Sequence, residues 1–484
     1  MAKFIKKYLM TDELFLVALT SLFLFVLWVF DPANKVIFVF FAIYLFILNR
    51  RIKNISLTLL LTFILSGIFF VGKTYSIQLH DLKQFPDLLF IYPQGLVNKI
   101  TLTFSDMIFV AIVLNFVLSI KKINFKNIRF TLLDFVILLF FIYGIFADIA
   151  SSKRLYFSLL FKKELFEYVF IYFYLRFFFT DHKRFFDLLT SLLAVMVVFE
   201  SYVAILQFIQ SAPMGKSIES VHGLSVFGAA PDELVYTFRP IGTFIFANNL
   251  GAYIAYIIPL LFIKFIQRSN WLFTIAFFCG MTTLFITLSR SAWFGAFVAI
   301  LFLIYIIEYR LKHNLTTNFL NKKKLFFLVL LSPLIFYSFP RITRSIYSFQ
   351  ESGGFYVRLQ QISSSLKLLE EHPMIGVGTA MGVVEGIEAD PTGVFASFPS
   401  PIHNYYFLTL VENGIPSFLL LIGIIMLGLR KILSDHTIMS YTMASIFISI
   451  IIIALFQPFL NFELLFICIA LKFDKINHDA KITS

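Results

Sequence analysis

Long apolar runs fill most of this sequence and constrain its fold more than any other feature. The chain is 59% hydrophobic and only 14% charged, which is far from the balance of a water-soluble protein. A run of about 20 apolar residues is long enough to cross a bilayer as a helix. The runs lie at 13–30, 36–49, 55–72, 106–120, 131–149, 165–180, 185–209, 242–263, 271–288, 292–308, 325–339, 404–429, 438–456 and 460–471. The sequence therefore predicts an all-α integral membrane protein with about 12–14 transmembrane helices, of which the shorter ones are tilted, buried or re-entrant.

Basic residues gather in the short loops between these runs, and they predict the topology. With the N-terminus in the cytoplasm, the positive-inside rule is satisfied at almost every short loop. The longer loops, at about 73–105, 150–164, 210–241 and 340–403, then face the exterior. The net charge of +12 is explained by topology and gives no indication of nucleic-acid binding. The inner basic clusters include Arg50-Arg51, Lys121-Lys122, Lys183-Arg184, Lys322 to Lys324 and Arg430-Lys431.

Three parts are expected along the chain. Residues 1–339 form a membrane core, residues 340–403 an extracytoplasmic loop, and residues 404–484 the C-terminal membrane helices. The loop contains a predicted amphipathic helix, in which Ile362, Leu366 and Leu369 share one face. Pro373 is expected to end this helix just before a glycine-rich turn.

His403 is the candidate catalytic residue. Ser400 suits a helix N-cap and Pro401 the first helical position, so His403 is expected in the first turn of the last long helix. The positive end of the helix dipole favours a neutral imidazole, which can accept a proton. The N–H groups of the same turn are a natural place for a phosphate. A polar residue at the entry to a membrane helix is the simpler interpretation of this turn alone.

Three arginines are expected on the same outer side. Arg239 stands at the entry to a span that contains Asn248 and Asn249, Arg290 in a short turn between two spans, and Arg358 at the start of the amphipathic helix. An arginine next to hydrocarbon is costly and is usually paired or functional. Structural roles stay open for Arg239 as an interface anchor, for the two asparagines as contacts between helices, and for Arg358 as a solvated residue.

Together these four residues predict a site for a diphosphate-containing substrate. Guanidinium groups bind phosphate through fixed forks of donors. A neutral histidine could take the proton of a sugar hydroxyl as it attacks. The outer loops contain neither an Asp-x-Asp pair nor a cluster of His and carboxylates with metal-ligand spacing. We therefore expect arginines rather than a metal ion to neutralise the leaving group, and we expect no cofactor.

The motifs around these residues resemble one family. The chain is similar to the O-antigen ligase/polymerase superfamily of polytopic bacterial membrane glycosyltransferases, which also includes protein O-oligosaccharyltransferases. The resemblance covers about 235–425, and Ser417 is a mild departure from it, since the family has Gly, Thr or Tyr there. The matching pieces are 239–249, 289–293, the Arg358 helix with its Glu-His-Pro-Met-Ile-Gly-Val-Gly ending at 371–378, and His403-Asn404 followed after nine residues by Gly414.

This resemblance implies a GT-C-like enzyme of the bacterial inner membrane. Its donor would be a glycan on undecaprenyl diphosphate, and its acceptor a glycan, lipid A-core or a protein at the periplasmic or outer face. The family's base corresponds to His403, and its diphosphate ligands correspond to Arg290, Arg358 and Arg239. Ligases, polymerases and protein-glycosylating enzymes share these motifs, so all three remain open.

A transporter or flippase of a lipid-linked glycan is the alternative. It would need polar groups along a route through the membrane, and the spans contain few of them. The deep polar residues are Asn115, Glu200, Gln207, Asn248 and Asn249. Because most of the other polar candidates gather on one face, the sequence favours the enzyme.

Overall fold

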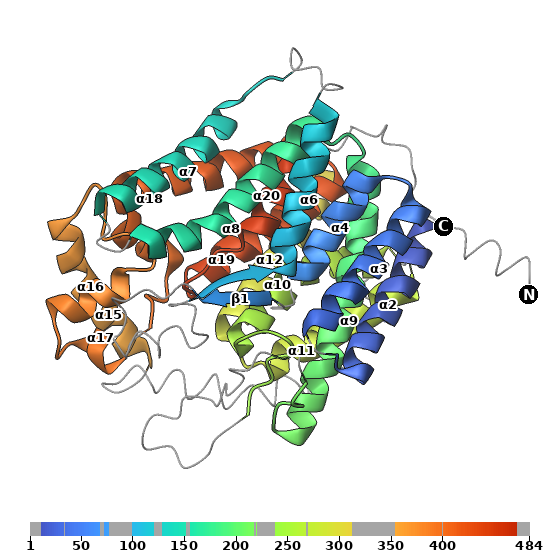
Figure 1. Cartoon of the computed structure of the whole chain (residues 1–484), viewed down its shortest axis with the longest axis horizontal. Coiled ribbons are helices and arrows are strands. Elements are labelled where there is room, and N and C mark those ends of the chain that lie inside the picture. Colours follow the sequence, from blue (N-terminus) through green and yellow to red (C-terminus); the bar gives the residue numbers. More distant parts are fainter. Residues whose placement is uncertain are drawn as a thin grey trace, which may run out of the picture.

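Helices dominate the structure, a computed structural model, and confirm the predicted all-α membrane class (Figure 1). The structure describes residues 11–32, 34–67, 72–76, 99–120, 128–151, 155–216, 219, 238–267, 270–311, 354–398 and 400–471. The predicted run at 325–339 and the part of the predicted outer loop before 354 lie outside these residues. So do several predicted basic clusters, including Lys121-Lys122 and Lys322 to Lys324.

Most helices in the first half of the chain lie close to the predicted apolar runs, but one begins at Leu155 rather than near 165, within the predicted outer loop at 150–164. A strand pair, β1 (Gly72–Ser76) and β2 (Lys99–Thr103), was not expected; the strands are antiparallel, with Gly72 opposite Thr103. The helices are α2 (Asp12–Phe30), α3 (Asn34–Ile52), α4 (Ile55–Gly67), α6 (Phe104–Ser119), α7 (Leu132–Ser151), α8 (Leu155–Phe173) with its π-helical continuation η5 (Tyr174–Phe178), and α9 (His182–Gln210).

The second half contains both membrane helices and a short helical subdomain. The subdomain consists of α15 (Gly354–Glu371), α16 (Gly382–Ala389) and α17 (Val394–Ser397). The apolar helices are α10 (Ala247–Ile266), α11 (Trp271–Ile286), α12 (Arg290–Leu311), α18 (Tyr405–Leu433), α19 (Ile438–Ala454) and α20 (Phe462–Ala470). Helix α12 packs along α10 and α19, whereas α18 packs along α7.

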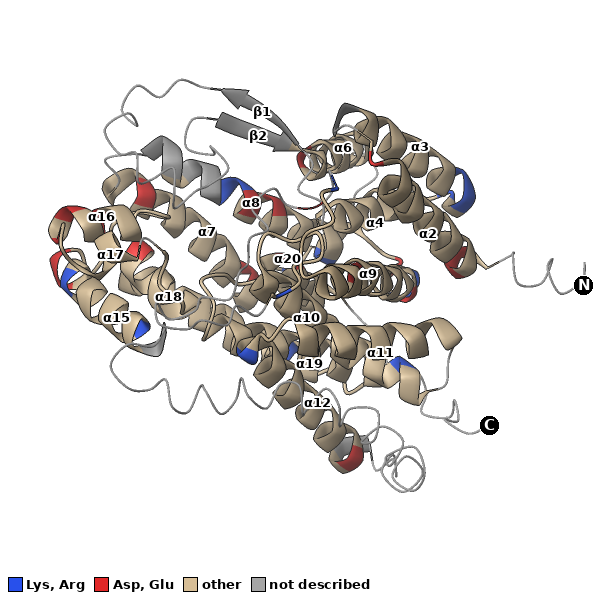
Figure 2. Ribbon diagram, turned by 90° about the horizontal axis from the view of Figure 1, so that it is seen from below, with Lys and Arg blue, Asp and Glu red and all other residues tan. Residues whose placement is uncertain are grey.

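The subdomain lies at one end of the helix bundle, beside α7 and α18, while α2 and α3 lie at the other side of the molecule (Figure 2). Following the predicted topology, we call the end that carries α15 to α17 the outer end, and the opposite end, where α2 and α9 begin, the inner end. Six described helices are long and apolar enough to cross a membrane, namely α2, α7, α9, α10, α12 and α18. Four shorter ones, α4, α6, α11 and α19, are also apolar. The total of 12–14 crossings stays a prediction, because it depends on the shorter helices.

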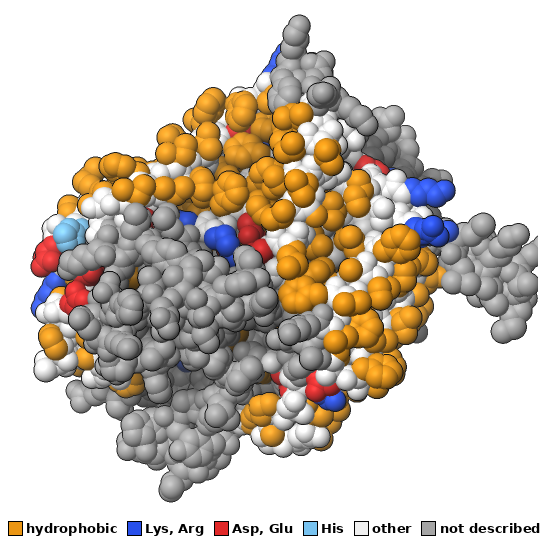
Figure 3. Space-filling model, in the orientation of Figure 1, with side chains coloured by type: hydrophobic (Ala, Val, Ile, Leu, Met, Phe, Trp, Pro, Cys, Tyr) orange, Lys and Arg blue, Asp and Glu red, His pale blue; other side chains and the backbone are white. Residues whose placement is uncertain are grey.

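Apolar side chains cover much of the lateral surface of the helix bundle. Figure 3 shows them as a broad band over α2, α3, α6 and α7. Phe25 on α2, Phe46 on α3, Leu114 on α6 and Phe146 on α7 are each more than half exposed. Exposed apolar surface on this scale is costly in water and suits contact with lipid. The protein is therefore a multi-pass membrane protein.

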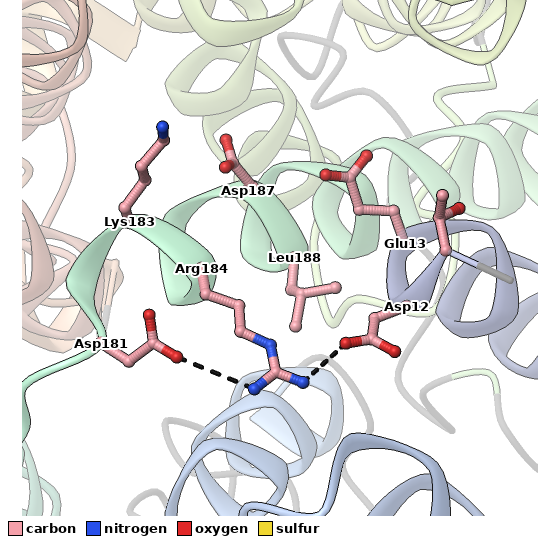
Figure 4. A pocket seen from close by; sticks show the side chains of 8 residues that line it. Asp12, Glu13, Asp181, Lys183, Arg184, Asp187 and Leu188 are labelled. Atoms are coloured by element: carbon pink, nitrogen blue, oxygen red, sulfur yellow. Dashed lines mark hydrogen bonds and ion pairs between the residues drawn. The ribbon is translucent and has the colours of Figure 1, made fainter.

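The inner end is held by a charge cluster that joins three helices. Arg184 at the start of α9 donates to Asp12 of α2 at 2.6 Å and to the Ile52 carbonyl at the end of α3 at 3.1 Å. Arg51 lies 3.5 Å from Asp12, and Asp181 lies 3.8 Å from Arg184. Figure 4 shows a hollow lined by Asp12, Asp181 and Arg184 of this group, together with neighbours such as Glu13 and Asp187. We call Asp12, Arg51, Asp181 and Arg184 the inner charge cluster. It brings two predicted cytoplasmic basic clusters and the start of α2 to the same end, as the topology requires.

Helix α18 differs from its prediction in two ways, at its start and at a break near Gly414. It begins at Tyr405 rather than near Ser400, because the Asn404 side chain caps it by accepting from the Phe407 N–H at 3.0 Å. His403 therefore lies in front of the helix and not in its first turn. The helix is also interrupted at Gly414, whose φ of 77° and ψ of 174° are not helical.

The α15 helix is confirmed, but a different face of it is buried. Gln361, Ser365 and Leu368 are buried, whereas Leu366 is 44% exposed. The reason is that α15 packs against α16, α17 and α18, so its buried face is determined by those neighbours and includes a hydrogen-bonded glutamine. Apolar periodicity alone cannot identify such a face.

Candidate active site

The loop in front of α18 carries His403 and is attached to α15. Gln361 of α15 donates to the Ser400 carbonyl at 3.0 Å and to the Ser400 hydroxyl at 3.1 Å. Ile402, next to His403, is buried in the small core of the subdomain. Arg358 lies one helical turn before Gln361, so the same helix positions the arginine and holds the histidine loop. Gln361 could not be identified from the sequence, because a buried glutamine gives no periodic signal.

Arg290, Arg358 and His403 lie near one another at the outer end. Burial lowers the pKa of Arg358, and the charge of Arg290 lowers it further. Burial likewise lowers the pKa of His403 to about 4, with the charge of Arg358 acting in the same direction and the nearby Pro401 backbone opposing it. A charge acts in this way only over short distances. We call these three residues the outer cationic cluster.

Among the described residues, the outer cationic cluster brings positive groups together without acidic partners. Within the described part of the chain, no ion pair joins Arg290 or Arg358 to a carboxylate. The Nδ1 atom of His403 is buried and makes no hydrogen bond to the described residues. Such an arrangement is unfavourable by itself and becomes favourable when an anion binds. Its histidine is neutral at physiological pH, as a proton acceptor must be.

The turn that carries Arg290 is firmly held. Trp293 donates its indole N–H to the Leu284 carbonyl at 2.7 Å, and Gln457 donates to the Ser291 hydroxyl at 2.8 Å. Leu288 has a positive φ of 52°, which closes the short connection between α11 and α12. The Arg290 side chain remains exposed at the start of α12. Its surroundings therefore fix the backbone and leave the guanidinium accessible.

Arg239 supports this turn. Its Nε donates to the Thr287 carbonyl at 2.6 Å, and its Nη2 donates to the Asn248 side chain at 2.7 Å. A cation at the carbonyl end of α11 is favoured by the helix dipole. Thr287 lies three residues before Arg290, so Arg239 contacts the turn that carries Arg290, and its guanidinium is engaged by the protein. Asn248 lies on α10 and Thr287 at the end of α11, so the two hydrogen bonds of Arg239 join these helices.

The glycine-rich segment after α15 fits into the break in α18. The N–H groups of Val377 and Gly378 donate to the carbonyls of Val411 and Glu412 at 3.1 and 2.8 Å. The Ile415 N–H donates to the Pro373 carbonyl at 2.9 Å. A side chain at Gly414 would collide with the Met374 carbonyl, and its φ is positive. The two glycine motifs, 36 residues apart in the sequence between Gly378 and Gly414, are thus the two sides of one backbone contact.

The deep polar residues of α9 are used by the fold. Gln207 accepts from the N–H groups of Ile241 and Gly242, each at 2.9 Å. Glu200 accepts from the Thr243 hydroxyl at 2.6 Å and from its N–H at 2.9 Å. They hold the segment that follows Arg239. Polar groups with such partners offer little to a permeating substrate.

No set of three His, Cys, Asp or Glu side chains that could hold a metal ion occurs among the residues described.

The outer end of this multi-pass membrane protein brings together two arginines and a neutral histidine. These are features of a membrane enzyme that acts on an anionic substrate. Residues 275–422 match the family model described as O-Antigen ligase, and this match supports the resemblance to the O-antigen ligase superfamily. The matched segment contains Arg290, Arg358 and His403, while Arg239 lies before it. A search of curated proteins finds no match to this chain. The family match supports an O-antigen ligase type of function and, at a coarse level, a lipid-linked glycan as donor.

Proposed function

We propose that this protein is a metal-independent glycosyltransferase that moves a glycan from undecaprenyl diphosphate to an acceptor at the extracytoplasmic face of the bacterial inner membrane. The observation that carries the proposal is the outer cationic cluster, in which Arg290, Arg358 and His403 lie together within the matched domain. Glycan transfer from a lipid diphosphate needs both an anion-binding group and a base, and this cluster supplies both.

The chemistry assigns one role to each type of residue. His403, neutral when free, removes the proton of the acceptor hydroxyl as its oxygen attacks the anomeric carbon. The bond between that carbon and the phosphate oxygen breaks, and the leaving diphosphate keeps the electron pair. Arg290 and Arg358 bind this diphosphate, and their charge stabilises it as it leaves. Arg239 acts mainly through the turn that holds Arg290.

The test is transfer by the purified protein. It is incubated with a synthetic undecaprenyl-diphosphate oligosaccharide and with candidate acceptors, and the products are separated by size. Long chains indicate a polymerase, and single additions to lipid A-core or to protein indicate a ligase or a protein-glycosylating enzyme. The rate should be unchanged by EDTA, since arginines replace a metal ion; strong inhibition by EDTA contradicts the metal-free scheme. Movement of the intact donor across a bilayer without transfer supports the transporter instead.

The sidedness has its own test. Single cysteines at Ser363 on α15 and at Ser484 at the end of the chain should react with an impermeant reagent from opposite sides of the membrane. Labelling from one side only contradicts the topology and an extracytoplasmic active site.

A further inference from the structure

A buried lysine on α8 lies next to the contact between the two glycine motifs. The Lys162 ammonium donates to the Asn413 side-chain oxygen at 2.9 Å and lies 3.8 Å from an Asp148 carboxylate oxygen. Lys162 is 7% exposed and Asp148 is 0% exposed. Gly144 of α7 makes room for the ammonium, since a side chain there would lie 2.8 Å from its nitrogen. Burial of these charges is costly, so the pair needs an explanation.

Both partners of Lys162 also bind Thr379. The Thr379 N–H and hydroxyl donate to Asp148 at 2.8 and 2.9 Å, and the Asn413 amide donates to the same hydroxyl at 2.9 Å. Ser158, on α8, donates to the Thr379 carbonyl at 3.0 Å. Every polar group of Thr379 is therefore bound.

These contacts lie between the two elements that carry the candidate active site. Thr379 ends the segment that follows α15, the helix of Arg358. Asn413 ends the first part of α18, which His403 precedes, and it lies directly before the break at Gly414. Lys162 and Asp148 thus hold Thr379, at the end of the segment that follows α15, against Asn413, at the end of the first part of α18. They also hold both of these segments against α7 and α8.

We propose that Lys162 and Asp148 are positioning residues that fix Arg358 relative to His403. The expected change in transfer rate rests on the proposed function, whereas the expected change in geometry does not. When the pair is lost, α15 and its arginine shift relative to the histidine loop. Arg358 still binds diphosphate, so donor affinity changes little, whereas the turnover rate falls. A displacement of about 1 Å is enough to cost roughly 10²-fold in rate.

The neighbouring lysine provides a matched control. Lys163 lies one residue along α8 and pairs with Asp106 at 2.6 Å, but Asp106 belongs to α6. Its loss removes an ion pair of the same chemistry that has no contact with Thr379. The positioning role therefore predicts opposite results for Lys162→Met and Lys163→Met.

The experiment combines kinetics with a distance measurement in nanodiscs. Spin labels are placed at Ser363 on α15 and at Phe456 at the outer end of α19, after Cys279 and Cys468 are replaced by alanine. Lys162→Met should broaden or shift the distance distribution and lower kcat by about 10²-fold with little change in donor Kd. Lys162→Arg should largely restore both, and Lys163→Met should change neither.

Thr379→Val covers the case in which Lys162→Met does not fold, because it removes the bridging hydroxyl without leaving a buried charge. It should broaden the same distribution to a smaller extent. Unchanged distances in Lys162→Met, or in Thr379→Val if the first variant does not fold, overturn the proposal. Equal losses in Lys162→Met and Lys163→Met overturn it as well. A changed distribution in a protein without transferase activity supports the positioning role and instead contradicts the proposed function.

Discussion

The two ends of the molecule use charge in opposite ways. In the inner charge cluster Arg184 lies between two carboxylates, and Asp12 also receives Arg51. In the outer cationic cluster the charge of Arg290 acts on Arg358 and that of Arg358 on His403. The inner cluster is balanced by its own side chains, whereas we propose that the outer one gains its balance from a bound anion. Balanced pairs hold helices together, while gathered like charges indicate a binding site.

The largest effect is expected at the outer arginines. Arg290→Ala and Arg358→Ala should each reduce glycan transfer to background, because the diphosphate loses its ligands, while the protein still accumulates in the membrane. Lysine should restore little activity at either position, since it cannot form the two-pronged contact of a guanidinium. The measurement is the transfer rate per amount of folded protein. Transfer that survives alanine at both positions would move the donor site elsewhere and end the contrast between the two clusters.

His403→Ala should lower kcat by about 10²–10⁴-fold, the usual contribution of a general base. Donor affinity should change little, because the arginines remain. The pKa of His403 is lowered to about 4, so the neutral form predominates above that pH. The profile of kcat/KM should therefore be flat from neutral pH downwards and fall only as the pH approaches 4. A bound diphosphate raises this pKa, so the fall in kcat should come at higher pH.

His372 provides the control for this prediction. It is exposed at the end of α15, and His372→Ala should transfer at nearly the wild-type rate. The base assignment is wrong if His403→Ala does the same, or if it loses donor binding as severely as the arginine variants do.

Gly414→Ala changes the support of the outer cluster without touching its charges. The backbone at Gly414 has a positive φ, and a side chain would collide with Met374. The free energy of unfolding should fall by about 2 kcal/mol or more, and the yield of folded protein should fall with it. Gly423, in the membrane part of α18, is the comparison, because a side chain there would meet only Val136, at 3.3 Å. Equal stability of the two alanine variants would show that the break is not required.

The smallest effect is expected at the inner end. Arg184 is about one third exposed, so Arg184→Ala should cost about 1 kcal/mol of stability or less. The transfer rate should stay within about twofold of wild type, because the inner cluster lies at the opposite end of the bundle. Thermal unfolding and the transfer assay measure the two quantities side by side. A large loss of transfer with unchanged stability would give the inner cluster a functional role and remove the contrast.

The sequence predicted the parts of the fold that follow from apolar length and charge. The run at 185–209 became α9, and the basic residues Arg51 and Arg184 meet at one end as the topology implied. The start of α18 was mispredicted, because Ser400 and Asn404 are both good caps and only the packing of the loop decides between them. The break at Gly414 was missed, since nothing local shows that Met374 lies against it.

The sequence could predict that the candidate residues share one side of the molecule, but not which partners surround them. Arg290, Arg358 and His403 were expected on one side, and the structure brings them together. Arg239 was expected to bind substrate, but its guanidinium is hydrogen-bonded to Thr287 and Asn248. Lys162 could not be singled out from the sequence, because nothing local shows that its ammonium meets Asn413. Partners that lie far apart in the sequence are decided by tertiary packing and leave no local pattern.

The interruption of α18 has a consequence for the response of this protein to its lipid environment. A thicker or thinner bilayer changes the tilt of a continuous spanning helix along its whole length. Here the part before Gly414 is tied to the segment after α15 and, through the Tyr406 hydroxyl, to the Ile451 carbonyl at 2.8 Å. The part after Gly414 can therefore follow the hydrocarbon thickness while His403 keeps its place. Reconstitution in lipids of different acyl-chain length should consequently alter the turnover rate only slightly.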